Sequence, residues 1–205
     1  MTADLKRLSD ATLVASVAEG RLEEFRRLVE RYEPFVYGTA MSYLKNPDEA
    51  REVTTKAFVK AYEDIESLDD ASHFASWLGR ITAAATGDAL SDLKASKDGG
   101  ADIGPRRIVL DEEEIEPLGE IEQAELRTRL YKKIRTLPRK YRTPVILKYV
   151  YGIDSKSIAR FLGNERETVK HRLHEVKKRL ARYYRAARVG SSAKARKHRG
   201  STEEA

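Results

Sequence analysis

The sequence contains no cysteine in its 205 residues, which excludes disulfide bonds, thiolate zinc sites and cysteine nucleophiles. No apolar run approaches the roughly 20 residues that a membrane-spanning helix needs. The N-terminal stretch MTADLKRLSD has no apolar core of the kind found in signal peptides. We therefore expect a cytoplasmic protein that does not insert into a membrane.

The sequence also lacks the marks of an enzyme. It shows no phosphate-binding glycine loop, no cluster of metal ligands and no nucleophile–base pair. His171 and His174 are spaced as helical metal ligands can be, but no third ligand accompanies them. We expect no catalytic residue, no metal and no cofactor.

Positive charge is concentrated near the C-terminus. The net charge is +6, and the segment Asn164–Arg199 holds 13 Lys and Arg against 3 Glu, or +10, so that the rest of the chain is at −4. A basic third on an acidic body favours a polyanion partner such as nucleic acid, although basic tails are also common without one.

Apolar residues recur at spacings of three and four, which predicts an all-α protein. The pattern marks one helical face in Arg21–Tyr43, a second over residues 50–65 and a third over residues 74–89. Together with a short helix over Leu13, Val14 and Val17, these form an N-terminal bundle of about four helices, residues 1–94.

Polar residues predict where these helices begin. Ser9 with Asp10, the turn at residues 46–48, and Ser72 can each cap a helix start. Pro34 should kink or interrupt the second helix, because proline has no N–H to donate.

Residues 95–120 break the helical pattern. They contain several Gly and Pro residues and the acidic run Asp111–Glu114, which predicts a flexible linker. Its acidity could screen a basic domain or simply keep the chain soluble. Helical spacing resumes in a C-terminal domain at residues 121–186, and the basic residues 187–205 are expected to form a disordered tail.

The segment Ile153–Tyr184 combines a short helix, a turn centred on Gly163 and a long basic helix, which is the pattern of a helix-turn-helix. It follows helices predicted at Ile121–Leu137 and Pro138–Tyr151. Asn164 and Glu167 can form a capping box on the long helix. The residues that should be buried are Ile158, Phe161, Leu162, Val169, Leu173, Val176, Leu180 and Tyr183.

Basic residues lie off this apolar stripe, near the helix end that enters the DNA major groove in this motif. An Arg or Lys at that end can read a guanine edge. Further along, Lys177, Lys178, Arg179 and Arg182 are better placed for phosphates, which position a protein without reading sequence.

Three motifs of this domain resemble those of bacterial sigma factors of the extracytoplasmic function (ECF) group, and the resemblance extends from about Asp10 to Tyr184. LPRKYR at 137–142 resembles "LPxxxR", SIA at 157–159 with LG at 162–163 resembles "EIAxxLG", and TVKHRL at 168–173 resembles "TVKSRL". The resemblance implies a domain like sigma region 4, which reads the −35 promoter element. The residues it would place on that DNA are Arg166, Glu167, Thr168, Lys170, His171, Arg172, His174, Lys177 and Lys178.

The N-terminal bundle resembles the other ECF domain, sigma region 2. Phe25, Leu28, Val29, Tyr32 and Tyr37 fit "FxxLVxxYxxxVY", and FASWLGRI at 74–81 is similar to "FRAWLYRI". The resemblance implies two helical domains joined by a linker. It also implies core RNA polymerase and promoter double-stranded DNA as partners and, for many members, an anti-sigma factor.

The sequence departs from the family on the helix that meets the polymerase clamp. The family has "DAEDVVQETFLRAW", whereas residues 49–62 are EAREVTTKAFVKAY. An acid, a Gln and an acid are replaced by Arg51, Thr55 and Lys56, which would weaken a polar interface with the same partner or indicate a different polymerase. The implied polymerase contacts are Glu49, Arg51, Glu52, Thr55, Lys56 and Lys60.

A second departure falls on the segment that meets the −10 element. The family's "ARNLAIDHLRRR" corresponds to TAAATGDALSDLK at 82–94, so that an Arg-Asn pair becomes Ala83-Ala84 and most of the basic cluster is lost. Single-strand capture relies on cationic and stacking groups. The remaining −10 candidates are Trp77, Arg80, Asp88 and Lys94.

These observations lead to two hypotheses. The first is a transcription initiation factor that binds core RNA polymerase and directs it to specific promoters, with no active site of its own. The second is a divergent sigma-like regulator that keeps the fold and the DNA reading but does not open promoters independently. Transcription in vitro without any other sigma factor separates the two.

Overall fold

The computed structural model describes residues 8–95, 129–130 and 132–199, with the backbone alone for 94–95 and 183–199. All regular elements in these residues are helices and none is a strand, which confirms the all-α prediction. Within the same residues, no helix is both long and apolar enough to cross a membrane.

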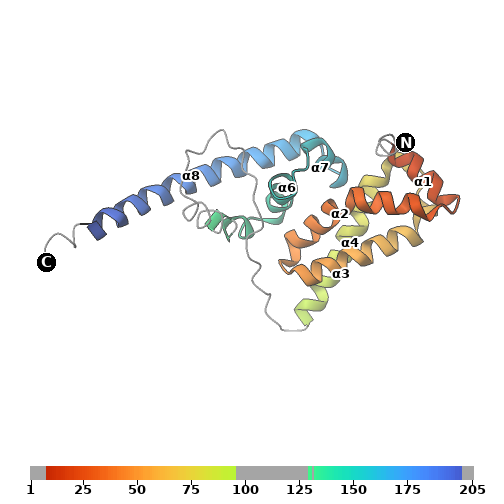
Figure 1. The fold of residues 1–205 in the computed structure, drawn as a ribbon, viewed down its shortest axis with the longest axis horizontal. Coiled ribbons are helices and arrows are strands. Elements are labelled where there is room, and N and C mark those ends of the chain that lie inside the picture. The colour runs from red at the N-terminus through yellow and green to blue at the C-terminus, as the bar shows by residue number, and fades with distance from the viewer. Residues whose placement is uncertain (1–7, 96–128, 131, 200–205) are drawn as a thin grey trace.

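The N-terminal domain is a bundle of four α-helices, drawn in red to yellow-green in Figure 1. Two short 3₁₀ turns, Ile65–Ser67 and Ala71–His73, connect the third helix to the fourth. The helices are α1 (Asp10–Ala18), α2 (Leu22–Leu44), α3 (Pro47–Glu63) and α4 (Phe74–Ala95).

Side-chain caps define the starts of α1 and α3. Ser9 accepts a hydrogen bond from the N–H of Thr12, and Asn46 accepts one from the N–H of Asp48, so these two predicted starts are confirmed. The prediction for Ser72 was wrong. Asp70 is the capping residue there, and its carboxylate accepts from the N–H of Ser72, because the chain first makes a 3₁₀ turn before α4.

Pro34 lies inside α2, yet the helix continues through it to Leu44. The interruption that the sequence predicted is therefore absent. Proline removes one backbone hydrogen bond, and the packing of α2 against α1, α3, α4 and α6 compensates for it.

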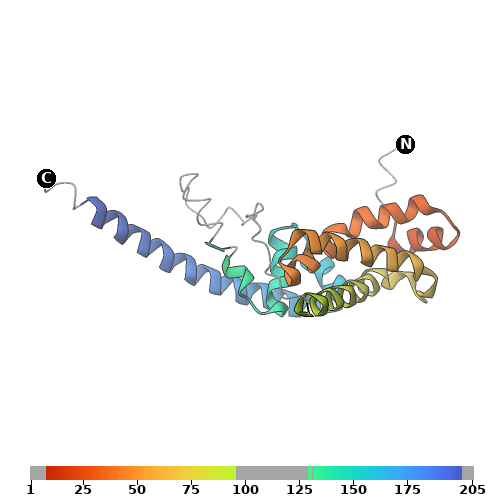
Figure 2. The same ribbon diagram turned by 90° about the horizontal axis from the view of Figure 1, so that it is seen from below.

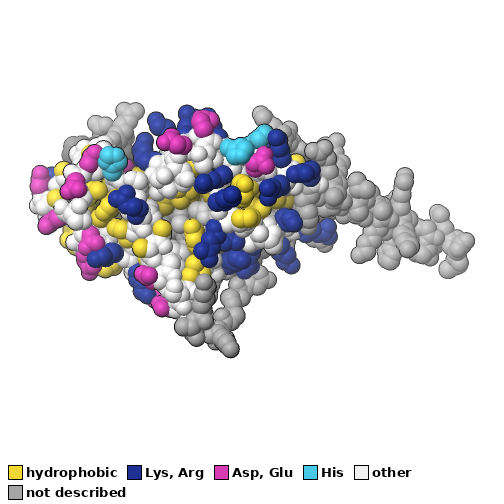
Figure 3. All heavy atoms as spheres, turned by 180° about the vertical axis from the view of Figure 1, so that it is seen from behind, with side chains coloured by type: hydrophobic (Ala, Val, Ile, Leu, Met, Phe, Trp, Pro, Cys, Tyr) yellow, Lys and Arg dark blue, Asp and Glu magenta, His cyan; other side chains and the backbone are white. Residues whose placement is uncertain are grey.

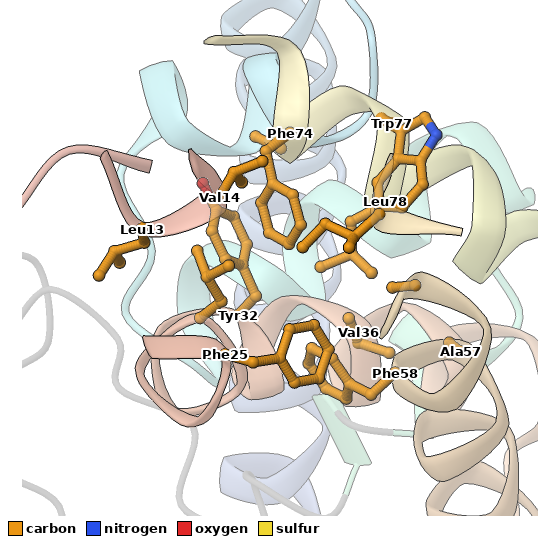
Figure 4. Packing of buried hydrophobic residues seen from close by; sticks show 14 of the residues in the cluster. Leu13, Val14, Phe25, Tyr32, Val36, Ala57, Phe58, Phe74, Trp77 and Leu78 are labelled. Atoms are coloured by element: carbon orange, nitrogen blue, oxygen red, sulfur yellow. The ribbon is translucent and has the colours of Figure 1, made fainter. Parts of the chain in front are cut away.

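Apolar side chains from all four helices form the main core, shown in Figure 4. Leu13, Leu28, Phe74 and Leu78 are completely buried in it. Each such side chain stabilises the fold by about 1.5–3 kcal/mol relative to an exposed one. A smaller cluster around Ala40, Leu44, Ala50 and Val53 closes the other end of the bundle.

The described part of the C-terminal domain starts with helical residues 129–130 and 132–135. The elements that follow are α6 (Arg139–Tyr149), α7 (Ser155–Phe161) and α8 (Arg166–Arg199). Gly152 after α6 and Gly163 between α7 and α8 have φ of 69° and 61°. This left-handed conformation is readily adopted only by glycine, and it allows each sharp change of direction.

The helix α8 projects far beyond the rest of the molecule (Figure 2) and ends at Arg199. The sequence predicted disorder from residue 187, so the structure differs there. Ala, Arg and Lys in this segment all favour helix, and adding residues to an existing helix is easier than starting one. The predicted linker beyond residue 95 and the tail residues 200–205 lie outside the described residues.

The two domains are in direct contact, which the sequence-based prediction of two helical domains joined by a linker did not include. Helix α6 packs against α2, and α7 packs against α4. The side chain of Phe161 in α7 belongs to the core of the N-terminal domain. The described parts of both domains therefore share one apolar core region.

The cap of α7 gives a test of local stability. Asp154 accepts hydrogen bonds from the N–H groups of Lys156 and Ser157 at 2.9 and 3.0 Å. Replacing Asp154 by Ala should lower the free energy of unfolding by about 1 kcal/mol, because both amides lose their acceptor. Thermal unfolding of the full chain measures this, with Asp154→Asn, which retains an acceptor oxygen, as the control.

The same carboxylate predicts a pH dependence. Hydrogen bonds from Ser157, and from the N–H of Lys156, hold the pKa of Asp154 below its usual 3.8. Because the pKa is lower in the folded state, the ionised carboxylate of Asp154 contributes fully to the free energy of unfolding above its unfolded-state pKa. The contribution is lost as the pH falls through the folded-state pKa. Asp154→Asn has no carboxylate at this position, so its free energy of unfolding should not show this loss at low pH. An equal acid response in both proteins would contradict the assignment.

Candidate nucleic-acid interface

The helix-turn-helix is formed by α7, the turn at Gly163 and the first half of α8. Val169, Leu173 and Val176 are buried where α8 meets α6 and α7, and Ile158 of α7 is completely buried beside them. The predicted inward stripe is thus confirmed for these residues, and Leu180 is partly buried against the same cluster. The side chain of Tyr183 lies outside the described part of the chain.

The opposite side of α8 carries the residues predicted to contact duplex DNA. Only Thr168 and Arg172 of that set are half-buried. The exposed members are Arg166, Glu167, Lys170, His171, His174, Lys177 and Lys178. Burial of the stripe fixes the rotation of the helix, and these side chains therefore lie together at its surface.

Surface charge is unevenly distributed on the face shown in Figure 3. Acidic side chains are most frequent at the end formed by the N-terminal domain, while Lys and Arg are denser toward the long helix. Such an arrangement attracts a polyanion to α8 and orients it relative to the rest of the protein.

The start of α8 differs from its predicted capping box. Asn164 precedes the helix, which begins at Arg166, and its side-chain amide donates to the carbonyl of Leu162 instead. The Nζ of Lys170 donates to Glu167 over 2.8 Å, and this hydrogen bond lowers the pKa of Glu167. Both side chains are exposed, so the pair costs little to separate when Lys170 turns to another partner.

Arg142 has a structural role that the sequence reasoning missed. It ends the LPRKYR segment and is 7% exposed, and its guanidinium donates to the carbonyls of Arg135 and Leu137. Those carbonyls lie where the preceding helical turns end, so Arg142 provides them with a cap. Burial lowers the pKa of Arg142.

The candidate polymerase contacts lie on the outer face of α3. Arg51, Glu52, Thr55, Lys56 and Lys60 are exposed, and Glu49 is half-buried. Their charges are largely paired within the helix: Lys56 with Glu52 at 2.7 Å, Lys60 with Asp64 at 2.9 Å, and Arg51 with Asp48.

Two apolar side chains on the same helix were not predicted as contacts. Val59 is 51% exposed and Tyr62 is 46% exposed. Apolar and aromatic groups surrounded by polar ones are typical of the centre of a protein–protein interface. The sequence could have predicted this exposure, because both positions lie off the helical stripe formed by the buried residues Val53, Ala57 and Ala61.

The −10 candidates whose side chains are described differ in exposure. Trp77 is only 8% exposed and packs in the core beside Phe74, so it supports the fold and does not offer a face to DNA. Its assignment as a DNA contact was therefore wrong. Trp77 lies on the same inward face of α4 as Phe74, Leu78 and Ile81. Arg80 and Asp88 are exposed, and the side chain of Lys94 lies outside the described part.

The described residues contain no group of three or more His, Asp or Glu side chains that could hold a metal ion.

Two family models match the chain, one for each domain. The model for Sigma-70 region 2 matches residues 28–95, and that for Sigma-70, region 4 matches residues 127–180. The sequence is 29% identical to ECF RNA polymerase sigma factor SigW of Bacillus subtilis over 179 residues, which are 84% of this chain and 95% of that protein. The chain belongs to the ECF RNA polymerase sigma factors.

Further similarities agree with this family. The ECF sigma factor is 28% identical to the ECF RNA polymerase sigma-E factor of Haemophilus influenzae over 184 residues, 85% of this chain and 95% of that protein. Its fold resembles that of CnrH, solved in complex with the cytosolic domain of CnrY, with a TM-score of 0.58, 20% identity, and coverage of 86% and 97% of the two chains. Its function is transcription initiation, in which a sigma factor directs RNA polymerase to promoters.

The family models assign the two surfaces to different regions of the ECF sigma factor. Region 2 includes α3 and α4, and region 4 includes α6, α7 and α8 as far as Leu180. The remainder of α8, through Arg199, extends beyond the matched region.

Salt dependence tests the basic surface of α8. If four side chains (Lys177, Lys178, Arg179 and Arg182) each neutralise a phosphate, log K for duplex binding should fall with log salt at a slope of about −3.6. Replacing Lys178 by Ala should reduce the slope by about 0.9. Fluorescence anisotropy of the full chain on a labelled duplex measures both.

Lys56→Ala on α3 is the control for this titration. Lys56 is also exposed, but it lies in the other domain, so its removal should leave the slope unchanged. Two outcomes would argue against α8 as the phosphate-binding surface. One is binding that does not depend on salt, and the other is a slope that Lys56→Ala reduces as much as Lys178→Ala does.

Proposed function

We propose that this ECF sigma factor binds core RNA polymerase through the outer face of α3 and reads a −35 promoter element with the first half of α8. The observation that carries the proposal is the division of α8 into two sides. Val169, Leu173 and Val176 are buried, while Lys170 and His171 are exposed on the other side. A helix of this kind, preceded by a short helix and a turn, can place its N-terminal half in the major groove.

The proposed roles of the two domains are complementary. The exposed side of α8 recognises the DNA sequence, and α3 binds the polymerase. On α3, the exposed side chains of Val59 and Tyr62 lie among paired charges. The polymerase performs RNA synthesis, and we place the site of action in the cytoplasm with it. An anti-sigma factor is a further proposed partner, on the basis of the family alone.

A second candidate function follows from α4. Ala83 and Ala84 are exposed where the family motif has Arg and Asn, and Arg80 is a cation that remains exposed near them. Capture of an unpaired strand depends on cationic and stacking groups. The alternative is therefore a sigma-like regulator that reads duplex DNA but does not open a promoter on its own.

Sequence reading by α8 can be tested with Lys170→Ala and Arg172→Ala. Each should weaken binding to a specific −35 duplex by about 1–3 kcal/mol, because a lost contact to a base edge costs that much discrimination. Binding to a random duplex should change much less. Lys178→Ala is the matched control, and it should weaken both duplexes by the same factor.

The duplex for this experiment comes from selection of binding sequences by the full chain. If Lys170→Ala and Arg172→Ala lose the same affinity for specific and for random DNA, these residues contact phosphates and do not read bases. The reading surface would then lie elsewhere.

Promoter opening can be tested by restoring the missing pair. The double change Ala83→Arg with Ala84→Asn adds polar groups at exposed helical positions, so the fold should tolerate it. It should increase RNA synthesis from an intact duplex promoter several-fold and have little effect on a template already unpaired at the −10 element. The measurement is a run-off assay with core RNA polymerase and no other sigma factor.

The wild-type protein decides between the two functions in the same assay. Promoter-specific RNA from the intact duplex supports the sigma factor. RNA from the unpaired template alone supports the regulator that lacks opening. No gain from the double change on duplex DNA would indicate that Ala83 and Ala84 do not limit opening.

A further inference from the structure

Helix α8 continues well past the part of the chain that matches the family. The model for Sigma-70, region 4 ends at residue 180, whereas α8 is one uninterrupted helix from Arg166 to Arg199. In Figures 1 and 2 its second half, in blue, leaves the rest of the molecule behind. We call residues 183–199, which follow the last predicted phosphate contact at Arg182, the α8 extension. At about 1.5 Å per residue it adds about 26 Å of helix.

The charge of the α8 extension has one sign. It holds six Lys and Arg residues and no Asp or Glu. The first part of α8 differs, because its cations alternate with Glu167 and Glu175. A helix whose charged residues serve only solubility usually mixes both signs. The composition of the α8 extension therefore indicates a partner of opposite charge.

This distribution also disfavours the helix itself. Like charges one turn apart repel each other. The helix macrodipole offsets such repulsion for cations in the last turn, next to Arg199. It does not do so for Arg188, about three turns before the end. Three like-charged pairs occur at a spacing of three residues: Arg185 with Arg188, Lys194 with Lys197, and Arg196 with Arg199.

Helical register places four of the six cations on the side of α8 that carries the predicted base contacts. Positions three or four residues apart share one side of an α-helix. Such steps lead from Lys170 and His174 through Lys178 into the α8 extension. The cations on this continued side are Arg185, Arg188, Arg196 and Arg199.

The remaining two cations belong to other sides of the helix. Lys194 continues the stripe of Val169 and Val176, which is buried in the first part of α8. Lys197 is separated from Lys170 by about seven and a half turns, so it lies on the opposite side. Charge is thus biased toward the side of Lys170, and the α8 extension contains its own control positions.

We propose that the α8 extension binds phosphates of the duplex next to the −35 element, through the side formed by Arg185, Arg188, Arg196 and Arg199. The inference rests on the proposed function, because the first half of α8 would hold the α8 extension against the DNA. A helix of about 26 Å spans about 8 base pairs at 3.4 Å each. Phosphate contacts carry no sequence information, so the α8 extension adds affinity and leaves promoter choice to Lys170 and its neighbours.

The length of the duplex separates the α8 extension from the rest of α8. On a duplex limited to the −35 site, log K should fall with log salt at the slope of about −3.6 expected without the α8 extension. On a duplex lengthened by about 10 base pairs at both ends, four more neutralised phosphates should give a slope of about −7.2. Replacing the four Arg residues by Gln should return the long duplex to about −3.6 and leave the short one unchanged. Fluorescence anisotropy of the full chain measures each slope.

Matched pairs of substitutions test the register. Arg196→Gln with Arg199→Gln and Lys194→Gln with Lys197→Gln each remove two charges from the same stretch of helix. The Arg pair should make the slope on the long duplex shallower by about 1.8, and the Lys pair should leave it near that of the wild type. Gln favours helix about as well as Lys and Arg do, so circular dichroism should show equal helix content in all variants.

Three results would overturn the proposal. One is a slope that is the same for the short and the long duplex. Another is an equal change for the Arg pair and the Lys pair, which would leave a diffuse charge effect without a binding side. The third is unchanged duplex binding by the four-Gln variant together with weakened binding to core RNA polymerase or to single-stranded RNA, which would assign the α8 extension to that partner.

The selectivity of the wild-type protein separates this inference from the proposed function. The ratio of affinities for specific and random duplexes reports on reading by the first half of α8, and the four-Gln variant should retain it. If the wild type shows no selectivity, the proposed −35 reading is wrong and the place of the α8 extension beside that element falls with it. If selectivity is present and duplex length has no effect on the slope, only the role of the α8 extension is wrong.

Discussion

The requirement that each helix bury one apolar stripe determines how this protein presents its functional side chains. In α8, burial of Val169, Leu173 and Val176 fixes the rotation of the helix, and Lys170 therefore faces the solvent. In α3, burial of Val53, Ala57 and Ala61 leaves Val59 and Tyr62 outside. The same physical effect thus builds the core and selects the residues that remain for partners.

Much of the fold follows from spacing and capping residues. The pattern of apolar residues predicts the four helices of the first domain, and Ser9 and Asn46 predict where two of them begin. Local rules succeed there because a cap or a stripe depends on neighbours within a few residues. They were less reliable at Ser72, where a 3₁₀ turn with its own cap precedes the helix, and at Asn164, which bonds backward to Leu162.

Contacts between remote segments were beyond this reasoning. Spacing predicts that Phe161 is buried, but it does not say that its partners are Tyr32 and Phe35 in the other domain. Periodicity identifies a face and not what covers it. Gly38 and Gly79 were the available signal, because a glycine inside a helix often marks a close approach. For the candidate site, the spacing predicted which residues of α8 are buried, and its DNA contacts stay a prediction. The family resemblance misassigned Trp77, which is buried in the core.

One side chain connects the beginning of the chain with the helix-turn-helix. The hydroxyl of Tyr32 donates to Asp10 at the start of α1, over 2.6 Å, while its ring stacks on Phe161 at the end of α7. Burial, together with Asp10, raises the pKa of Tyr32, so this phenol stays neutral and retains its proton for the bond. Helix α1 therefore supports the position of α7 through Tyr32. A change in α1 would in this way affect the packing of the helix-turn-helix.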